Sequence, residues 1–152
     1  MKAITHLAAF ALVSSALVST ALATTLEGWS TDLEKAFKDA KEQNKPVLVE
    51  FTGSDWCPPC KMMRKKVFSQ KEFVTAASED FILVELDFPR GDKEVKAKND
   101  PYAKKYEIKG FPTVILFDSE GKEFERFFAS KHPSTEAFLA HLDKALENKG
   151  LD

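Results

Sequence analysis

Four short apolar runs along the chain have the composition and length of β-strands. Residues 47–51, Val-Leu-Val-Glu-Phe, are apolar at neighbouring positions, which predicts a strand buried on both faces of a sheet. Comparable runs occupy residues 81–88, 113–117 and 122–128. The last two are separated by a glycine-containing turn sequence at 118–121, and this spacing predicts an antiparallel hairpin.

Helical spacing of apolar residues is clearest before the first strand and after the last. Thr31 and Glu34 have the spacing of a capping box at the start of the first helix, which is expected to end near Asn44. The final helix is expected to begin after Ser134 as its cap and to stop before Gly150.

Weaker helical signals lie between the strands. A helix is expected to begin at residues 58–60, where prolines fit a first turn because its amides have no partners within the helix. Another is expected over 69–77, with Ser69 as its cap. Residues 90–109 are highly charged, so we expect an exposed stretch in which Pro101 begins a short helix.

The order of elements is therefore helix, strand, one or two helices, strand, helix, strand, strand, helix. Strands separated by helices imply parallel crossovers, whereas the hairpin adds an antiparallel pair. The pattern predicts a single α/β domain with a central mixed sheet flanked by helices, over residues 24–152.

The first 23 residues have a different character. Lys2 precedes a run of 16 residues, 7–22, without a charge, and the sequence Ala21-Leu22-Ala23 follows the small-x-small cleavage pattern. The run is shorter than the ~20 residues of a typical membrane-spanning helix. We therefore expect residues 1–23 to be a signal peptide, with an uncleaved membrane anchor as the alternative, and a mature protein that is periplasmic or secreted.

Composition narrows the function classes. The 152 residues are 43% hydrophobic and 30% charged, which is typical of a globular protein rather than a disordered one. The net charge of −2 gives no electrostatic support for nucleic-acid binding, which would usually require a strongly basic domain. We expect a monomer.

Cys57 and Cys60 are the only two cysteines, and two residues separate them. A zinc site normally needs four ligands, which the chain does not offer at suitable spacing, so we expect no metal. A structural disulfide over so short a loop would restrict the unfolded chain little. A redox pair is the remaining interpretation. At the start of a helix, unpaired amides would stabilise the thiolate of Cys57, an exposed nucleophile, with Cys60 as the buried resolving thiol.

The chain resembles the thioredoxin superfamily in two motifs. One is Trp56-Cys57-Pro58-Pro59-Cys60-Lys61 after a hydrophobic strand, and the other is Gly110-Phe111-Pro112-Thr113 before the next one. The sequence of residues 51–57 is most similar to that of exported bacterial thioredoxin-like proteins of the thiol:disulfide interchange type. The resemblance implies a thioredoxin-like fold with a four- to five-stranded sheet, and a cis-proline at Pro112.

The resemblance also implies roles for single residues. Cys57 would attack a substrate disulfide and Cys60 would release the product. Pro112 would shape the substrate groove, and the backbone of Phe111 would pair with substrate. Trp56 would cover the site, with a plain core tryptophan as the alternative.

Glu50 falls where thioredoxins carry a buried acid that helps to deprotonate the resolving cysteine; an exposed strand-end residue is the alternative. The chain departs from the family in having Glu rather than Asp at this position. The loop from this acid to Cys57 is also one residue longer than in the family. The strand ending in Glu85-Leu86-Asp87 lacks the lysine often placed near that acid. Lys61, Arg64 and Lys65 continue the helix, either adding positive potential or forming its solvated face.

These features together predict a thiol–disulfide oxidoreductase that reduces, or isomerises, disulfides of exported proteins. The enzyme is expected to need no cofactor. Pro58 offers no amide to the thiolate, which favours a reducing couple. A membrane electron donor would recharge the pair. The alternatives are a thiol reductase for cytochrome c maturation and, in another class, a non-catalytic peptide-binding or chaperone-like module.

Overall fold

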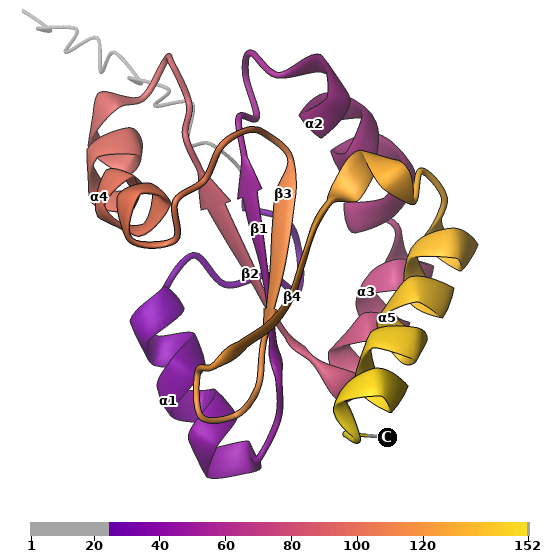
Figure 1. Cartoon of the computed structure of the whole chain (residues 1–152). Coiled ribbons are helices and arrows are strands. Elements are labelled where there is room, and N and C mark those ends of the chain that lie inside the picture. Colours follow the sequence, from indigo (N-terminus) through magenta and orange to yellow (C-terminus); the bar gives the residue numbers. More distant parts are fainter. Residues whose placement is uncertain (1–24, 152) are drawn as a thin grey trace, which may run out of the picture.

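A four-stranded mixed sheet forms the centre of the computed structural model, which describes residues 25–151. The strands, in the order in which they lie side by side, are β2 (Ile82–Asp87), β1 (Val47–Thr52), β3 (Thr113–Phe117) and β4 (Glu123–Phe128) (Figure 1). β1 is parallel to β2 and antiparallel to β3, and β3 pairs antiparallel with β4. The predicted α/β class, the mixed sheet and the hairpin are confirmed.

β1 is the central support of the sheet. All six of its residues are buried, including Glu50, as the apolar composition of residues 47–51 predicts for a strand covered on both faces. Its side chains alternate between two cores: Val49 and Phe51 face one core, and Leu48 faces the other. Glu50 shares the face of Leu48, because residues two apart along a strand point the same way.

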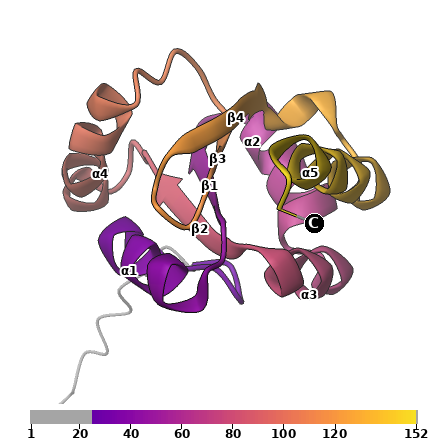
Figure 2. The ribbon, with the colours of Figure 1, turned by 60° about the horizontal axis from the view of Figure 1, so that its bottom comes forward.

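One face is covered by α1 (Leu33–Gln43) and α4 (Lys93–Lys105), as Figure 2 shows. The predicted cap of α1 is wrong by one residue. Asp32, not Thr31, is the N-cap, because its carboxylate accepts the Lys35 amide at 2.9 Å.

The structure of α4 differs from the prediction for residues 90–109, both in where the helix begins and in the position of Pro101. The helix begins after Asp92, whose carboxylate accepts the amides of Glu94 and Val95, and Pro101 lies inside the helix rather than at its start. The proline removes one helical hydrogen bond. The buried Asn99 anchors the same turn of the helix, because its side-chain amide donates to the Asp87 carbonyl at 2.7 Å. The stretch is therefore one long helix, docked to β2 on one side.

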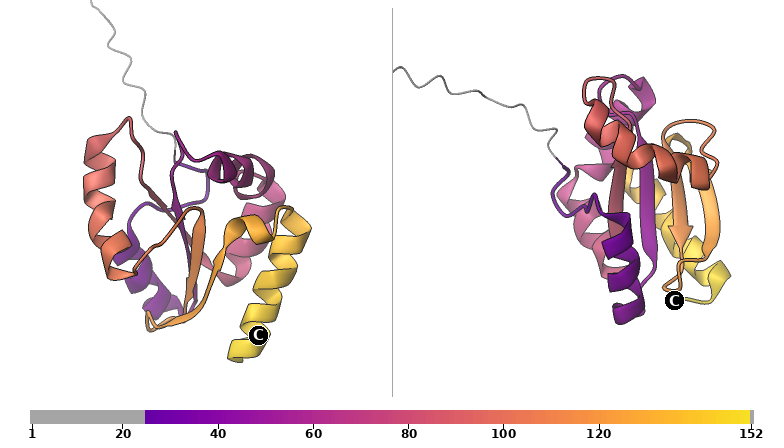
Figure 3. Two further views of the ribbon diagram at one scale, coloured as in Figure 1. Left: turned by 45° about the horizontal axis from the view of Figure 1, so that its top comes forward. Right: turned by 90° about the vertical axis from the view of Figure 1, so that its left-hand side faces the viewer.

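The other face is covered by α2 (Pro58–Met63), the π-helical turn η1 (Arg64–Phe68), α3 (Lys71–Asp80) and α5 (Thr135–Lys149) (Figure 3). The 3-10 turn η2 (Ala129–Lys131) joins β4 to this layer.

Of the predicted caps on this face, Ser134 is confirmed and Ser69 is wrong. Ser69 ends the π-helical turn, and the backbone of Gln70 begins α3 without a side-chain cap. Within residues 25–151, no helix has the length and apolar character needed to cross a bilayer. The predicted signal peptide lies outside the described residues.

Candidate active site

The two cysteines lie at the point where β1 passes through a short loop into α2. Cys57 is the N-cap of α2, and its Sγ accepts the amide of Cys60 at 3.3 Å. The two sulfurs form a disulfide. The expectation that Cys57 is exposed is wrong for this oxidised state, since Cys57 is 3% exposed and Cys60 is 1% exposed. The sulfur of Cys57 is turned toward Cys60 and its amide, and this removes it from solvent.

The prolines limit the donors that face the Cys57 sulfur. An N-cap side chain normally accepts from the second or third amide of its helix. Here the second position is Pro59, which has no N–H, so the amide of Cys60 at the third position is the remaining donor of that pair. The cap geometry therefore assigns the missing donor to Pro59, rather than to Pro58 at the first position.

Trp56, the residue before Cys57, belongs to neither of the two cores. Its indole is half-buried, and its Nε1 donates to the Phe88 carbonyl at 2.8 Å. Gly53 lies directly beneath the ring, where an added Cβ would stand 2.6 Å from the indole. A glycine at this position is required by that close approach.

The segment that leads into β3 lies at the same end of the sheet as the start of α2 (Figure 1). The Phe111–Pro112 peptide bond is cis, as the resemblance implies, and Pro112 is buried. The Phe111 ring meets the Trp56 ring edge to face, with 5.7 Å between centroids. The tertiary structure thus brings the two motifs into contact through Trp56 and Phe111.

Glu50 is buried, with 1% of its surface exposed, and it points to the sheet face that α2 covers. The alternative of an exposed strand-end residue is thereby excluded. One of its carboxylate oxygens, Oε1, has no hydrogen-bond partner among the described residues. Burial, and then the neighbouring Glu85, raise the pKa of Glu50 well above its usual range. Glu50 therefore keeps its protonated form to a higher pH than an exposed glutamate does.

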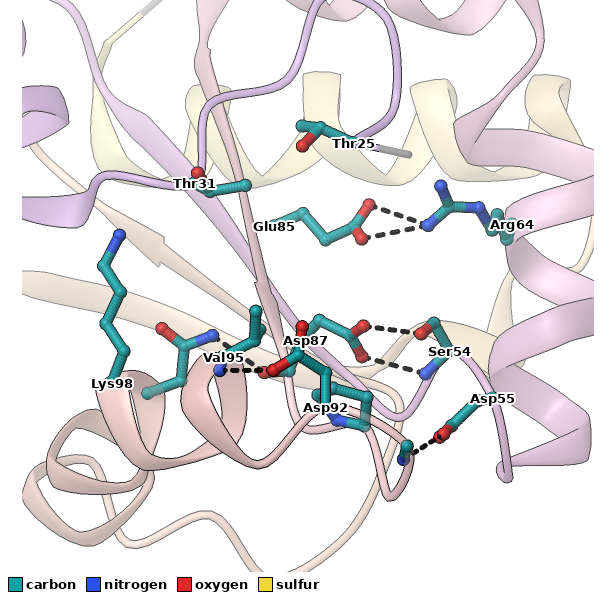
Figure 4. Close-up of a pocket in the computed structure, with 13 residues that line it drawn as sticks. Thr25, Thr31, Ser54, Asp55, Arg64, Glu85, Asp87, Asp92, Val95 and Lys98 are labelled. Carbon is teal, nitrogen blue, oxygen red and sulfur yellow. Dashed lines mark hydrogen bonds and ion pairs between the residues drawn. The ribbon is translucent and has the colours of Figure 1, made fainter. Parts of the chain in front are cut away.

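Glu85 is a second buried carboxylate. The sequence predicted no role for it and indicated only that its strand lacks a lysine near Glu50. Glu85 stands opposite Glu50 in the parallel register of β1 and β2. Arg64 binds both oxygens of Glu85 through Nη1, at 2.9 and 3.1 Å (Figure 4). Arg64 is therefore not part of a solvated helix face, whereas Lys61 and Lys65 are exposed. Burial raises the pKa of Glu85, and Arg64 opposes that rise.

The sequence contains a signal that places Glu50 beside Glu85. Two of the predicted strands contain three apolar residues followed by glutamate, Val-Leu-Val-Glu50 and Ile-Leu-Val-Glu85. When such strands pair in parallel and in phase, the acids fall side by side on one face.

An open cavity of about 640 Å³ adjoins Glu85 and Arg64 (Figure 4). Ser54 and Asp87 lie on its wall, and the Ser54 hydroxyl and amide both donate to the Asp87 carboxylate. Asp55 accepts the backbone amides of Arg90 and Gly91. These bonds tie the loop before Cys57 to the segment after β2.

Comparison with known proteins identifies the class that this fold and site define. A family model described as a Thioredoxin-like domain matches residues 33–146. The chain belongs to this thioredoxin-like family.

Individual relatives carry names from disulfide chemistry. The chain is 35% identical over 101 residues to the disulfide bond reductase DsbH of Chlamydia pneumoniae, covering 64% of this chain and 60% of the relative. It is 31% identical over 111 residues to the thiol:disulfide interchange protein DsbD of Escherichia coli (strain K12), covering 73% of this chain and 18% of DsbD. The match therefore spans less than two thirds of each of these relatives.

Solved structures agree with the fold. The structure of a DsbH oxidoreductase is similar with a TM-score of 0.70 and 28% identity, over 92% of this chain and 95% of that one. The oxidised C-terminal domain of DsbD from Neisseria meningitidis has a TM-score of 0.55 and 26% identity, over 77% of this chain and 98% of that domain. The thioredoxin-like fold inferred from the two motifs is confirmed.

Proposed function

We propose that this protein is an exported thiol–disulfide reductase that acts on disulfides of proteins. The observation that supports it most strongly is the Cys57–Cys60 disulfide at the start of α2, with Phe111 and cis-Pro112 at the same end of the sheet and the buried Glu50 on the face beneath. The names of the relatives, a disulfide bond reductase and thiol:disulfide interchange proteins, support the same class of reaction.

The first step starts from the reduced pair. The Cys57 thiolate attacks one sulfur of the substrate disulfide, and a bond forms between Cys57 and that sulfur. The substrate S–S bond breaks, and its other sulfur leaves as a thiolate that takes a proton from solvent. Trp56 and Phe111 form the walls against which the substrate chain would lie, while Pro112 shapes the floor.

The second step releases the product. Glu50, in its carboxylate form, accepts the thiol proton of Cys60, and the Cys60 thiolate attacks the sulfur of Cys57. The mixed disulfide breaks, and the second substrate sulfur leaves as a thiolate that takes a proton from solvent, while Glu50 returns to solvent the proton that it accepted. Two electrons have then passed from the cysteine pair to the substrate. The pair ends as the disulfide seen in this structure. A carboxylate with a raised pKa is a suitable base for this transfer.

The cap of α2 supports a reducing direction of electron flow. With proline at the second helical position, the amide of Cys60 is the one donor of the usual pair that is left to stabilise the Cys57 thiolate. A less stabilised thiolate makes the reduced pair a stronger reductant. An external thiol donor in the membrane would return the two electrons. Residues 1–23 serve as the signal peptide in this proposal, and the mature chain acts as a monomer in the periplasm or outside the cell.

Insulin reduction by dithiothreitol tests the activity. The wild-type protein should accelerate the reaction, Cys57→Ser should abolish the acceleration, and Cys60→Ser should trap a mixed disulfide. Equal rates with wild type and Cys57→Ser would refute the reductase and leave a peptide-binding module. Equilibration with glutathione then tests the direction, because a potential as oxidising as about −120 mV would contradict a reductase.

A further inference from the structure

A second cavity, of about 260 Å³, opens beside Trp56 on the side facing α4. Trp56, Phe88 and Phe111 form its aromatic side. Ala103 of α4 contributes to the opposite side, and Arg90 also lines the cavity. Trp56 directly precedes Cys57, and Trp56 and Phe111 are also the walls of the proposed substrate groove, so this cavity extends that groove toward α4.

The walls of this cavity are held in place before any ligand arrives. The Nε1 of Trp56 donates to the Phe88 carbonyl, and the Phe88 and Phe111 rings are 5.2 Å apart. The Asp55 carboxylate accepts the Arg90 amide at 3.0 Å, which fixes the backbone that carries the guanidinium. A preformed site loses little conformational freedom when it binds.

The cavity carries one uncompensated charge. Lys96 and Asp100, both on α4, pair with each other at 2.7 Å and cancel. The Arg90 guanidinium lies over the Trp56 ring, 4.7 Å from its centroid, and no carboxylate among residues 25–151 forms an ion pair with it. The cavity therefore combines an apolar aromatic side with a positive group already stacked on it.

We propose that this cavity is a substrate subsite that accepts an apolar side chain of the client polypeptide, with Arg90 binding a carboxylate next to it. The aromatic side would bury the apolar group. The guanidinium, oriented by Trp56, offers paired donors that suit a carboxylate. This inference rests on the proposed reductase function and adds a preference for acidic–apolar sequence beside the client cysteine.

Four peptide disulfides test the subsite. They are identical except near the cysteine, where they carry Leu with Glu, Leu with Gln, Leu with Lys, or Ser with Glu. The rate constant of the pre-reduced protein is measured with each peptide and with hydroxyethyl disulfide, a small neutral substrate. We expect the Leu–Glu peptide to react about threefold faster than the Leu–Gln peptide, because an exposed ion pair contributes modestly. The difference should shrink as salt is added.

Variants assign the effect to the cavity. Arg90→Gln should remove the preference for Glu and Arg90→Glu should reverse it, while the exposed Lys93→Gln keeps it. Ala103→Phe should fill the cavity and remove the preference for Leu over Ser, while Ala97→Phe, on the exposed side of α4, keeps it. Rates with hydroxyethyl disulfide should stay within about twofold throughout.

The outcomes separate the two proposals. Equal rates with all four peptides, or an unchanged preference in Arg90→Glu, would overturn the subsite and leave the reductase intact. Failure of the reduced wild-type protein to react with any peptide or with hydroxyethyl disulfide would instead overturn the reductase.

Discussion

Glu50 and Glu85 stand opposite each other in the parallel register of β1 and β2, with both carboxylates buried on one face of the sheet. Arg64 binds Glu85 directly. Arg64 is thus the cation that offsets the charge of both buried acids. Because two buried negative charges repel each other, the free energy of the pair is lower when one acid is protonated. Arg64 pairs with Glu85 and opposes the rise of its pKa, whereas the pKa of Glu50 is raised well above the usual range. Glu85 also borders the open cavity, whereas Glu50 is not among the residues that line it.

Glu50→Gln should raise the stability of the oxidised protein at neutral and alkaline pH. The pKa of Glu50 is raised in the folded state, so the folded protein binds more protons than the unfolded chain above the ordinary carboxyl pKa. Wild-type stability therefore falls as pH rises from that value through the folded pKa, by at most about 1.4 kcal/mol per pH unit. Urea unfolding at pH 4, 6 and 8 measures this, and a gap between variant and wild type that does not widen with pH would contradict it.

Glu85→Gln should lower the pKa of Glu50. It removes a neighbouring negative charge and leaves Arg64 to attract the remaining carboxylate, and both changes favour the ionised form of Glu50. Carboxyl-carbon NMR titration of Glu50 reads this directly, with the exposed Glu79→Gln as the matched control. A Glu50 pKa that is unchanged, or higher, in Glu85→Gln would show that the two acids are not coupled.

Pro59→Ala should make the cysteine pair more oxidising, because the new amide at the second helical position can donate to the Cys57 thiolate. A single such hydrogen bond is worth about 0.5–1.5 kcal/mol, which corresponds to roughly 10–30 mV. Pro58→Ala is the matched control, since the first amide does not face the cap side chain. The glutathione equilibrium measures both potentials, and equal shifts in the two variants would rule out the cap geometry as the cause.

Gly53→Ala should displace Trp56 and destabilise the protein by about 1–3 kcal/mol, because its Cβ would stand 2.6 Å from the indole ring. Near-ultraviolet circular dichroism reports the ring, and thermal unfolding reports the stability. The same substitution in a Trp56→Ala background should cost much less if the clash is responsible. An equal cost in both backgrounds would point to the backbone at residue 53 instead.

Much of the fold could be predicted because its signals are local. The apolar run at 47–51 requires burial on both faces, and a glycine turn joins the last two strands. The errors fall where tertiary contacts outweigh local preference. Pro101 lies inside α4 because Asp92 begins the helix earlier and Asn99 anchors it to β2. The sequence left open whether Arg64 adds positive potential or forms a solvated helix face, and only the packing of α2 and η1 on the sheet brings it to Glu85.

The sequence by itself determined the chemistry that is carried in consecutive residues: the cysteine pair with its prolines, the tryptophan before it, and the Phe111–Pro112 motif. The tertiary structure decided which groups surround that chemistry, because neighbours across a sheet or between layers depend on register and packing rather than on spacing along the chain. The parallel register of β1 and β2 set Glu50 beside Glu85. The bonds between Asp55 and the segment after β2 set Arg90 over Trp56.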